Sequence, residues 1–227
     1  YRATGEKKYL DLAKYFVDER GRLPHYFDIE AEARGEKRRA DSPGSYFYYQ
    51  AHEPVREQKE AVGHSVRAMY LYSAMADVAR ETGDRELLDA CRRLWEDTVT
   101  KKMYVTGGIG STKEGERFTF AYDLPNETAY AETCANIGLV FFSHRMLLVE
   151  KDARYADVME RAFYNSVLSG IGLDGESFFY ANPLAVGPDD GQEKPGHVAP
   201  ARSKWFGCSC CPPNVARIIE SFGRYMY

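Results

Sequence analysis

The stretch AETCANIGLVFFSHRMLLVE, residues 131–150, decides how this chain folds. Its apolar residues lie so close together that a helix here would have almost no polar face, which is typical of a helix buried on all sides. The turn KDA at 151–153 follows, and then RYADVMERAFYNSVLSG at 154–170, which continues as a second helix. The two segments predict a helical hairpin.

The same design occurs once before in the chain. Helical periodicity runs over 57–82 and stops at a turn, TGD, and an amphipathic helix follows over 85–102. Asp84 in that turn is a good N-cap for the second helix. The opening segment, residues 4–21, repeats the pattern of this second helix 78 residues earlier. The predicted helices of the two complete hairpins are 57–82, 85–102, 135–150 and 153–168.

A period of about 70 residues with two helices per unit is typical of stacked helical hairpins. An open solenoid and a closed toroid both fit this period. The first helix of each pair is the more apolar, as an inner helix would be, so we favour an all-α toroid of inner and outer helices. Two long loops interrupt the repeat, at 104–124 and 171–210, and each is predicted to hold a short strand, the second within 176–186 (ESFFYANPLAV).

Length and charge limit the function. The chain has 227 residues, 44% of them hydrophobic, and a formal net charge of −4. This balance suits one globular domain and gives no reason to expect binding to nucleic acid or to a membrane. The chain begins without Met and stops in mid-pattern, so we expect a fragment of a longer protein. Its five cysteines are clustered, which favours a metal site or a reactive thiol over a disulfide scaffold.

The repeat brings three chemically capable side chains into register. His64 and Glu132 are 68 residues apart, and Cys210 follows 78 residues later, just before a predicted helix with Pro212 in its first turn. All three therefore lie near the N-termini of successive inner helices, where the helix dipoles favour anions such as thiolate. We expect them to meet at the floor of one pocket.

Two motifs supply candidate metal ligands. Glu132 and Cys134 form E-x-C, and Cys208, Cys210 and Cys211 form C-x-C-C. Zinc accepts thiolate and carboxylate in a tetrahedron, so five candidates compete for four places. In a regular helix, side chains at i and i+2 point about 200° apart. A site that uses both Glu132 and Cys134 therefore requires an irregular backbone or a helix that begins later.

Other residues give weaker signals. Cys91 and His144 lie inside predicted helices and are expected to pack in the core. His52 and His197 lie in loops and indicate nothing. The GGIGS stretch at 107–111 lacks the spacing, strand and helix of a dinucleotide-binding motif, so we interpret it as a turn.

Two residues gain interest from their position. Glu116 lies in the long loop that leads into the helix of Glu132. Tyr180 ends a strand-like run that approaches the cysteines. Solvated acids and buried tyrosines are common, so position alone assigns neither a function.

Four stretches together resemble glycoside hydrolase family 127, whose founding members are β-L-arabinofuranosidases. They are YVTGGIGS (104–111), GERFTF (115–120), YDLPNETAYAETCANIGLVFF (122–142) and WFGCSCCPPN (205–214). The resemblance runs over essentially the whole chain. It implies an (α/α)6 barrel followed by β-sandwich domains. Residues 1–227 would be part of that single catalytic domain, with upstream helices and the C-terminal sandwiches outside this chain.

The resemblance also implies a reaction, that of a retaining glycoside hydrolase with a zinc-bound cysteine nucleophile. By motif, the Zn²⁺ ligands would be Glu132, Cys134, Cys210 and Cys211. Cys210 would be the nucleophile and Glu116 the general acid/base, while His64 and Tyr180 would contact the sugar. Because Glu116 must be protonated for the first step, we expect its surroundings to raise its pKa.

Two other functions compete with hydrolysis of β-L-arabinofuranosides. One is a non-catalytic, carbohydrate-binding helical scaffold clamped by a structural zinc, since four closed ligands are usual in structural sites. The other is a redox protein using Cys208 and Cys211, against which the absence of a thioredoxin-like βαβ pattern argues. The expected partner is a small-molecule or oligosaccharide substrate. Reduced thiols favour the cytoplasm, and the oligomeric state, a homodimer included, stays open.

Overall fold

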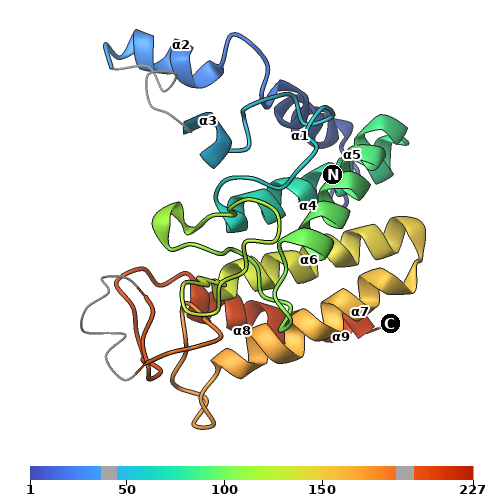
Figure 1. Ribbon diagram of the computed structural model, residues 1–227. Coiled ribbons are helices and arrows are strands. Elements are labelled where there is room, and N and C mark those ends of the chain that lie inside the picture. Colours follow the sequence, from blue (N-terminus) through green and yellow to red (C-terminus); the bar gives the residue numbers. More distant parts are fainter. Residues whose placement is uncertain (37–44, 188–196, 227) are drawn as a thin grey trace.

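The structure, a computed structural model, describes residues 1–36, 45–187 and 197–226. In this part of the chain it consists of helices joined by long loops (Figure 1). The main helices are α1 (Lys7–Glu19), α2 (Tyr26–Ala33), α3 (Ser45–Tyr48), α4 (Ser65–Thr82), α5 (Arg85–Lys101), α6 (Thr133–Glu150), α7 (Ala153–Ala162), α8 (Cys211–Ser221) and α9 (Gly223–Met226). The predicted all-α class is confirmed.

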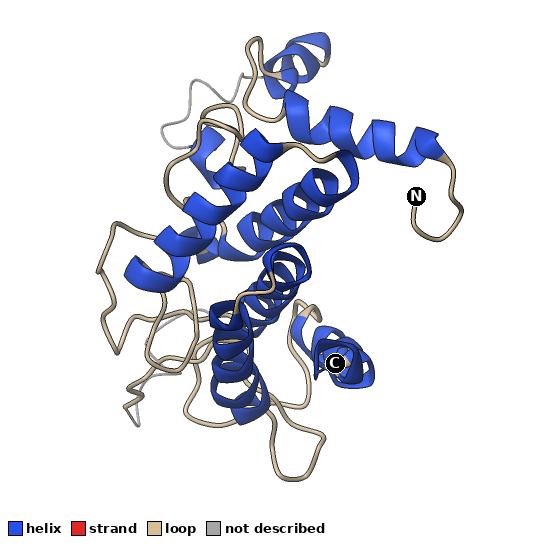
Figure 2. Cartoon of the chain, turned by 90° about the vertical axis from the view of Figure 1, so that its right-hand side faces the viewer, coloured by secondary structure: helices blue, strands red, loops and turns tan. Residues whose placement is uncertain are grey.

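The helices form an inner and an outer layer of part of a toroid. In the inner layer, α6 packs against both α4 and α8. In the outer layer, α5 packs against α4 and α7 packs against α6, which gives two helical hairpins. Figure 2 shows the same helices and the loops between them from a second side. Every residue from Thr133 to Ser143 is buried. The inner position predicted for this apolar helix is therefore confirmed.

The two hairpin turns are built in the same way. Gly83 ends α4 in the left-handed conformation with φ of 70°, and the Asp84 side chain then accepts a hydrogen bond from the Leu87 N–H at 2.9 Å. Lys151 ends α6 with φ of 56°, and Asp152 accepts from the Arg154 N–H at 2.9 Å. A left-handed residue followed by an aspartate N-cap is the local signal that produces the sequence repeat.

One predicted helix begins later than expected, and another changes its type within the predicted range. Residues 57–64 are not helical, and Gly63 has φ of +73°, a value that interrupts a helix. The position requires glycine, because a Cβ there would lie 2.0 Å from the Phe47 carbonyl oxygen. The helix after Asp152 leaves regular α geometry at Phe163–Val167, a π-helical turn. In that turn the Ser166 carbonyl accepts a hydrogen bond from the Asn136 side-chain amide at 3.0 Å.

The short strands predicted in the two long loops were also wrong. Across the described residues of these loops, extended pairing is limited to isolated bridges such as Phe178 with Ser203. The run around Tyr180 bonds instead to different segments in turn. The Thr133 N–H donates to the Tyr180 carbonyl at 2.9 Å, and the Asn182 N–H donates to the Tyr130 carbonyl at 2.9 Å. These single bonds fix the loop onto the start of α6.

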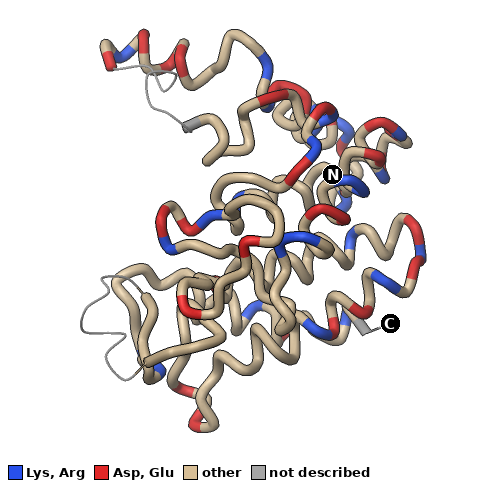
Figure 3. Tube along the Cα trace, in the orientation of Figure 1, with Lys and Arg blue, Asp and Glu red and all other residues tan. Residues whose placement is uncertain are grey.

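The outer helices carry charges of both signs. Acidic and basic residues alternate along α5 and α7 (Figure 3), as expected for solvated outer faces. No helix among the described residues is long and apolar enough to cross a membrane.

Candidate active site and metal centre

The N-termini of the three inner helices converge on one site. His64 is the N-cap of α4, Glu132 the N-cap of α6 and Cys210 the N-cap of α8. The Glu132 carboxylate lies within 4.8 Å of donor atoms from both of the other two residues. The register predicted from the repeat therefore holds in three dimensions. It places these side chains at the positive ends of three helix dipoles.

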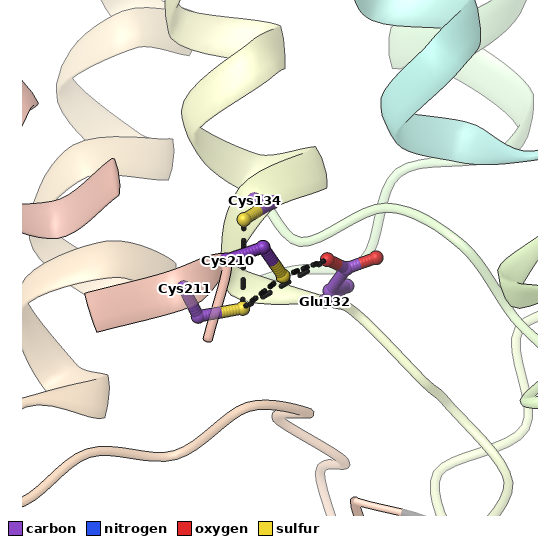
Figure 4. A group of neighbouring side chains, drawn as sticks. All are labelled: Glu132, Cys134, Cys210 and Cys211. Carbon is purple, nitrogen blue, oxygen red and sulfur yellow. Dashed lines mark hydrogen bonds between the residues drawn. The ribbon is translucent and has the colours of Figure 1, made fainter. Parts of the chain in front are cut away.

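The four expected ligands form one cluster (Figure 4). Donor atoms of Glu132, Cys134, Cys210 and Cys211 all lie within 4.8 Å of one another. The Cys134 and Cys211 sulfurs are 3.5 Å apart, and the Glu132 Oε1 atom lies 3.5 Å from the Cys210 sulfur and 3.8 Å from that of Cys211. Sulfurs and oxygens around a tetrahedral zinc are separated by distances of this order.

The backbone resolves the difficulty raised by the E-x-C spacing. Glu132 is extended, with φ of −56° and ψ of 134°, and the helix begins only at Thr133. Ala131 before it has φ of 41°, an unusual value for a residue with a side chain. Its carbonyl accepts hydrogen bonds from the side-chain amides of Asn136 at 3.1 Å and Asn182 at 2.9 Å. This turn aims the Glu132 and Cys134 side chains at one point.

The cluster fits a soft divalent cation. Its donors are three thiols and one carboxylate, the set that zinc accepts. Glu132 is only 2% exposed, and its buried Oε2 atom has no hydrogen-bond partner among the residues that the structure describes. An unpaired buried carboxylate oxygen is costly unless a cation or another donor satisfies it.

Hydrogen bonding within the cluster lowers the pKa of one of its thiols. The pKa of the Cys210 thiol lies far below its ordinary value, because the Cys134 and Cys211 thiols and the Tyr180 hydroxyl donate toward it. The pKa of Cys134 is raised by its contact with Cys210, and that of Cys211 by its contacts with Cys134 and Cys210. Burial, followed by the charge of Glu116, raises the pKa of Glu132 to about 9. Ionising all four groups together would require a bound cation.

Glu116 lies beside the cluster and is held on both carboxylate oxygens. His64 Nε2 is 3.0 Å from Oε2, and the Tyr130 hydroxyl donates to Oε1 at 2.9 Å. These two partners, His64 first, lower the pKa of Glu116 although its partial burial opposes the change. The predicted rise in the pKa of Glu116 is therefore wrong, because the sequence did not reveal how closely His64 and Tyr130 bind this carboxyl group.

Comparison with known proteins points to one family. The sequence model described as "Beta-L-arabinofuranosidase, GH127 catalytic domain" matches residues 1–224. The chain belongs to glycoside hydrolase family 127. A non-reducing end β-L-arabinofuranosidase of Bifidobacterium longum subsp. longum is 46% identical over the whole chain, which spans 35% of that relative.

Solved GH127 structures share the fold. A β-L-arabinofuranosidase from Geobacillus stearothermophilus T6 superposes with a TM-score of 0.95 at 57% identity. A GH127 β-arabinofuranosidase superposes with a TM-score of 0.83 at 48% identity. Each match covers all of this chain but only 36% and 31% of those chains, respectively. The GH127 chain thus spans about a third of the length of its relatives.

Tyr180 contacts the cluster of four expected ligands, as its place at the end of a run that approaches the cysteines suggested. Its hydroxyl is hydrogen-bonded to the Cys210 sulfur at 3.1 Å, and its ring stacks on His197 with centroids 3.7 Å apart. Burial, together with the bond to Cys210, raises the pKa of Tyr180. The hydroxyl therefore stays protonated and available as a donor to a thiolate.

Sequence reasoning missed two neighbours of the site. Tyr130 carried no signal because an aromatic residue before a helix is common, and His197 was set aside as a loop residue. The Tyr130 hydroxyl lies 2.8 Å from His197 Nδ1. The prediction that Cys91 packs in the core is confirmed, since Cys91 is fully buried. Of the five candidate ligands, Cys208 is the one outside the cluster of four, and it is exposed.

Proposed function

We propose that the protein containing this chain is a retaining glycoside hydrolase that releases β-L-arabinofuranose from β-L-arabinofuranosides. The observation that carries the proposal is that an ionisable thiol, Cys210, and a loop carboxyl, Glu116, both lie within 4.8 Å of Glu132 in a GH127 domain. Retaining hydrolysis needs one group that attacks the anomeric carbon and one that protonates the leaving oxygen.

Cys210 is the proposed nucleophile. Its low pKa favours the thiolate, which is the reactive form of cysteine. The sulfur attacks the anomeric carbon while the leaving oxygen takes a proton, and the glycosyl group is held on Cys210. Water then attacks the same carbon, and the sulfur leaves as thiolate, which the Tyr180 hydroxyl at 3.1 Å can stabilise.

Glu116 is the proposed general acid/base. The proton for the first step can reside on Nε2 of His64 or on the Glu116 carboxyl, whose oxygen lies 3.0 Å away. After the leaving group departs, the Glu116 carboxylate can accept a proton from the attacking water. By resemblance to glycoside hydrolase family 127, His64 and Tyr180 are the proposed contacts to the sugar.

Zn²⁺ is the proposed metal, held by Glu132, Cys134, Cys210 and Cys211. When bound, it supplies positive charge that keeps the thiols of its ligands ionised. The unpaired Oε2 atom of Glu132 and the three converging sulfurs support this assignment. The alternative function is a carbohydrate-binding scaffold in which the same four side chains hold a purely structural zinc.

Residues 1–227 are proposed to be part of one (α/α)6 catalytic domain, completed by upstream helices and followed by β-sandwich domains. The free thiols of the described cysteines suit a reducing compartment, so we place the protein in the cytoplasm.

Hydrolysis by the full-length protein tests the proposal. An aryl β-L-arabinofuranoside should release its phenol. In the presence of methanol, the methyl arabinofuranoside that forms should have the β configuration of the substrate, as read by NMR. An α-L-arabinofuranoside serves as the control. Binding of the sugar without turnover would favour the scaffold, and an inverted product would contradict the proposed nucleophile.

The two neighbouring cysteines should differ in their effect on zinc. Cys211 is fully buried inside the cluster, whereas Cys208 is exposed. Cys211→Ser should therefore lose most bound zinc, measured by elemental analysis of the full-length protein, while Cys208→Ser should keep it and retain most activity. Equal zinc loss in both variants would mean that the four ligands are wrongly chosen.

A further inference from the structure

Tyr130 is a buried residue for which the proposed reaction has no role. It lies two positions before Glu132, is 2% exposed, and donates its N–H to the Gly110 carbonyl at 3.1 Å. Its hydroxyl meets two groups, Glu116 Oε1 at 2.9 Å and His197 Nδ1 at 2.8 Å. A hydroxyl placed between a carboxylate and an imidazole joins them in one hydrogen-bonded chain.

The direction of this chain follows from counting protons. A tyrosine hydroxyl has one proton to donate, and an ionised carboxylate can only accept. The Tyr130 proton therefore points to Glu116, and His197 must donate its Nδ1 proton to the Tyr130 oxygen. Stacking of His197 on Tyr180 at 3.7 Å holds the imidazole in the orientation that this requires.

Glu116 needs such support because it lies in a loop. It ends a 3₁₀ turn, Glu114–Glu116, with φ of +50°, directly after Gly115 with φ of +70°. No regular helix or strand fixes its side chain, so the carboxyl orientation depends on its hydrogen bonds. His64 holds one oxygen and Tyr130 the other.

We propose that Tyr130, itself held by His197, is a positioning residue that fixes the Glu116 carboxyl for proton transfer. This inference rests on the proposed role of Glu116 as the acid/base. Positioning matters because a displacement of about 1 Å in a reacting group can cost about 100-fold in rate. Tyr130 acts through Glu116 and not on the sugar, so its loss should affect kcat more than KM.

Tyr130→Phe in the full-length protein tests the proposal. With an alkyl β-L-arabinofuranoside, which needs protonation to leave, kcat should fall about 10- to 100-fold while KM changes less than about threefold. Zinc content should not change. Tyr104→Phe is the matched control, because Tyr104 is also 2% exposed but donates to the Pro125 carbonyl at 3.2 Å, and it should keep the wild-type kcat.

The decisive comparison combines two variants. If Tyr130 acts through Glu116, adding Tyr130→Phe to Glu116→Gln should cost no further activity, whereas a general structural defect would lower both backgrounds by the same factor. Equal losses in the two backgrounds, or a wild-type kcat in Tyr130→Phe alone, would overturn the proposal. Full activity of Glu116→Gln alone would instead contradict the proposed role of Glu116, on which the Tyr130 proposal rests.

Variants of His197 provide a second, independent test of the proposal. His197→Ala removes the donor to the Tyr130 oxygen and should lower kcat with the alkyl glycoside. His197→Asn places an amide N–H near the position of Nδ1 and should recover most of that loss. Equal activity of the alanine and asparagine variants would contradict a donor role for His197.

Discussion

Cys210→Ser in the full-length protein should nearly abolish hydrolysis, lowering kcat on the order of 10⁴-fold or more, as loss of a covalent nucleophile typically does. A serine hydroxyl stays protonated where the thiol ionises, so the attacking group is lost. The loss should be similar for activated and unactivated leaving groups, because attack on the anomeric carbon fails in both. The loss is measured by comparing the steady-state rates of the variant and the wild-type protein with an aryl and with an alkyl glycoside.

Loss of a metal ligand must be separated from loss of the nucleophile. Cys134→Ser is the matched control, because Cys134 lies in the same cluster and its sulfur is 3.5 Å from that of Cys211. Any Cys134→Ser protein that retains zinc should still form a glycosyl-enzyme, detected by intact mass after rapid quenching. Cys210→Ser should form none at any zinc content. A sugar adduct mapped to another residue would refute Cys210 as the nucleophile.

The fold could be predicted because its signals are local and repeated. Asp84 and Asp152 are N-caps that recur with one period, and the apolar stretch of α6 can be stable only as an inner helix. The same register located His64, Glu132 and Cys210 at three helix N-termini. The equivalent position within each repeat, and not an equal spacing, thus brings residues far apart in the chain to one place.

The rest of the site depends on contacts without a local signal. His197 reaches Tyr130 through a loop whose path is set by isolated contacts, such as the two hydrogen bonds that Phe178 and Ser203 exchange at 2.9 and 3.0 Å. The strand-like run around Tyr180 suggested a strand, but this segment bonds to several different segments and pairs continuously with none of the described ones. The pKa of Glu116 was mispredicted for the same reason.

Glu116→Gln should lower kcat by roughly 10²- to 10⁴-fold with an alkyl β-L-arabinofuranoside, the usual contribution of general acid catalysis. Glutamine keeps the size of the side chain and an oxygen acceptor for Tyr130, but it has no proton to transfer. Glycosylation of the enzyme by an activated aryl glycoside should be much less affected, because a good leaving group departs without protonation. A pre-steady-state burst of phenol, followed by slow turnover, should reveal this difference.

Azide should then restore turnover of Glu116→Gln with the aryl substrate. The anion attacks the glycosyl-enzyme without a general base, so the slow second step no longer needs Glu116, and the product should be a glycosyl azide of retained configuration. Cys210→Ser, in which no glycosyl-enzyme forms, should show neither a burst nor rescue. Glu114→Gln is the control for charge, since Glu114 lies in the same turn and is exposed. If azide fails to rescue a zinc-loaded Glu116→Gln protein that still binds substrate, the acid/base must be another residue.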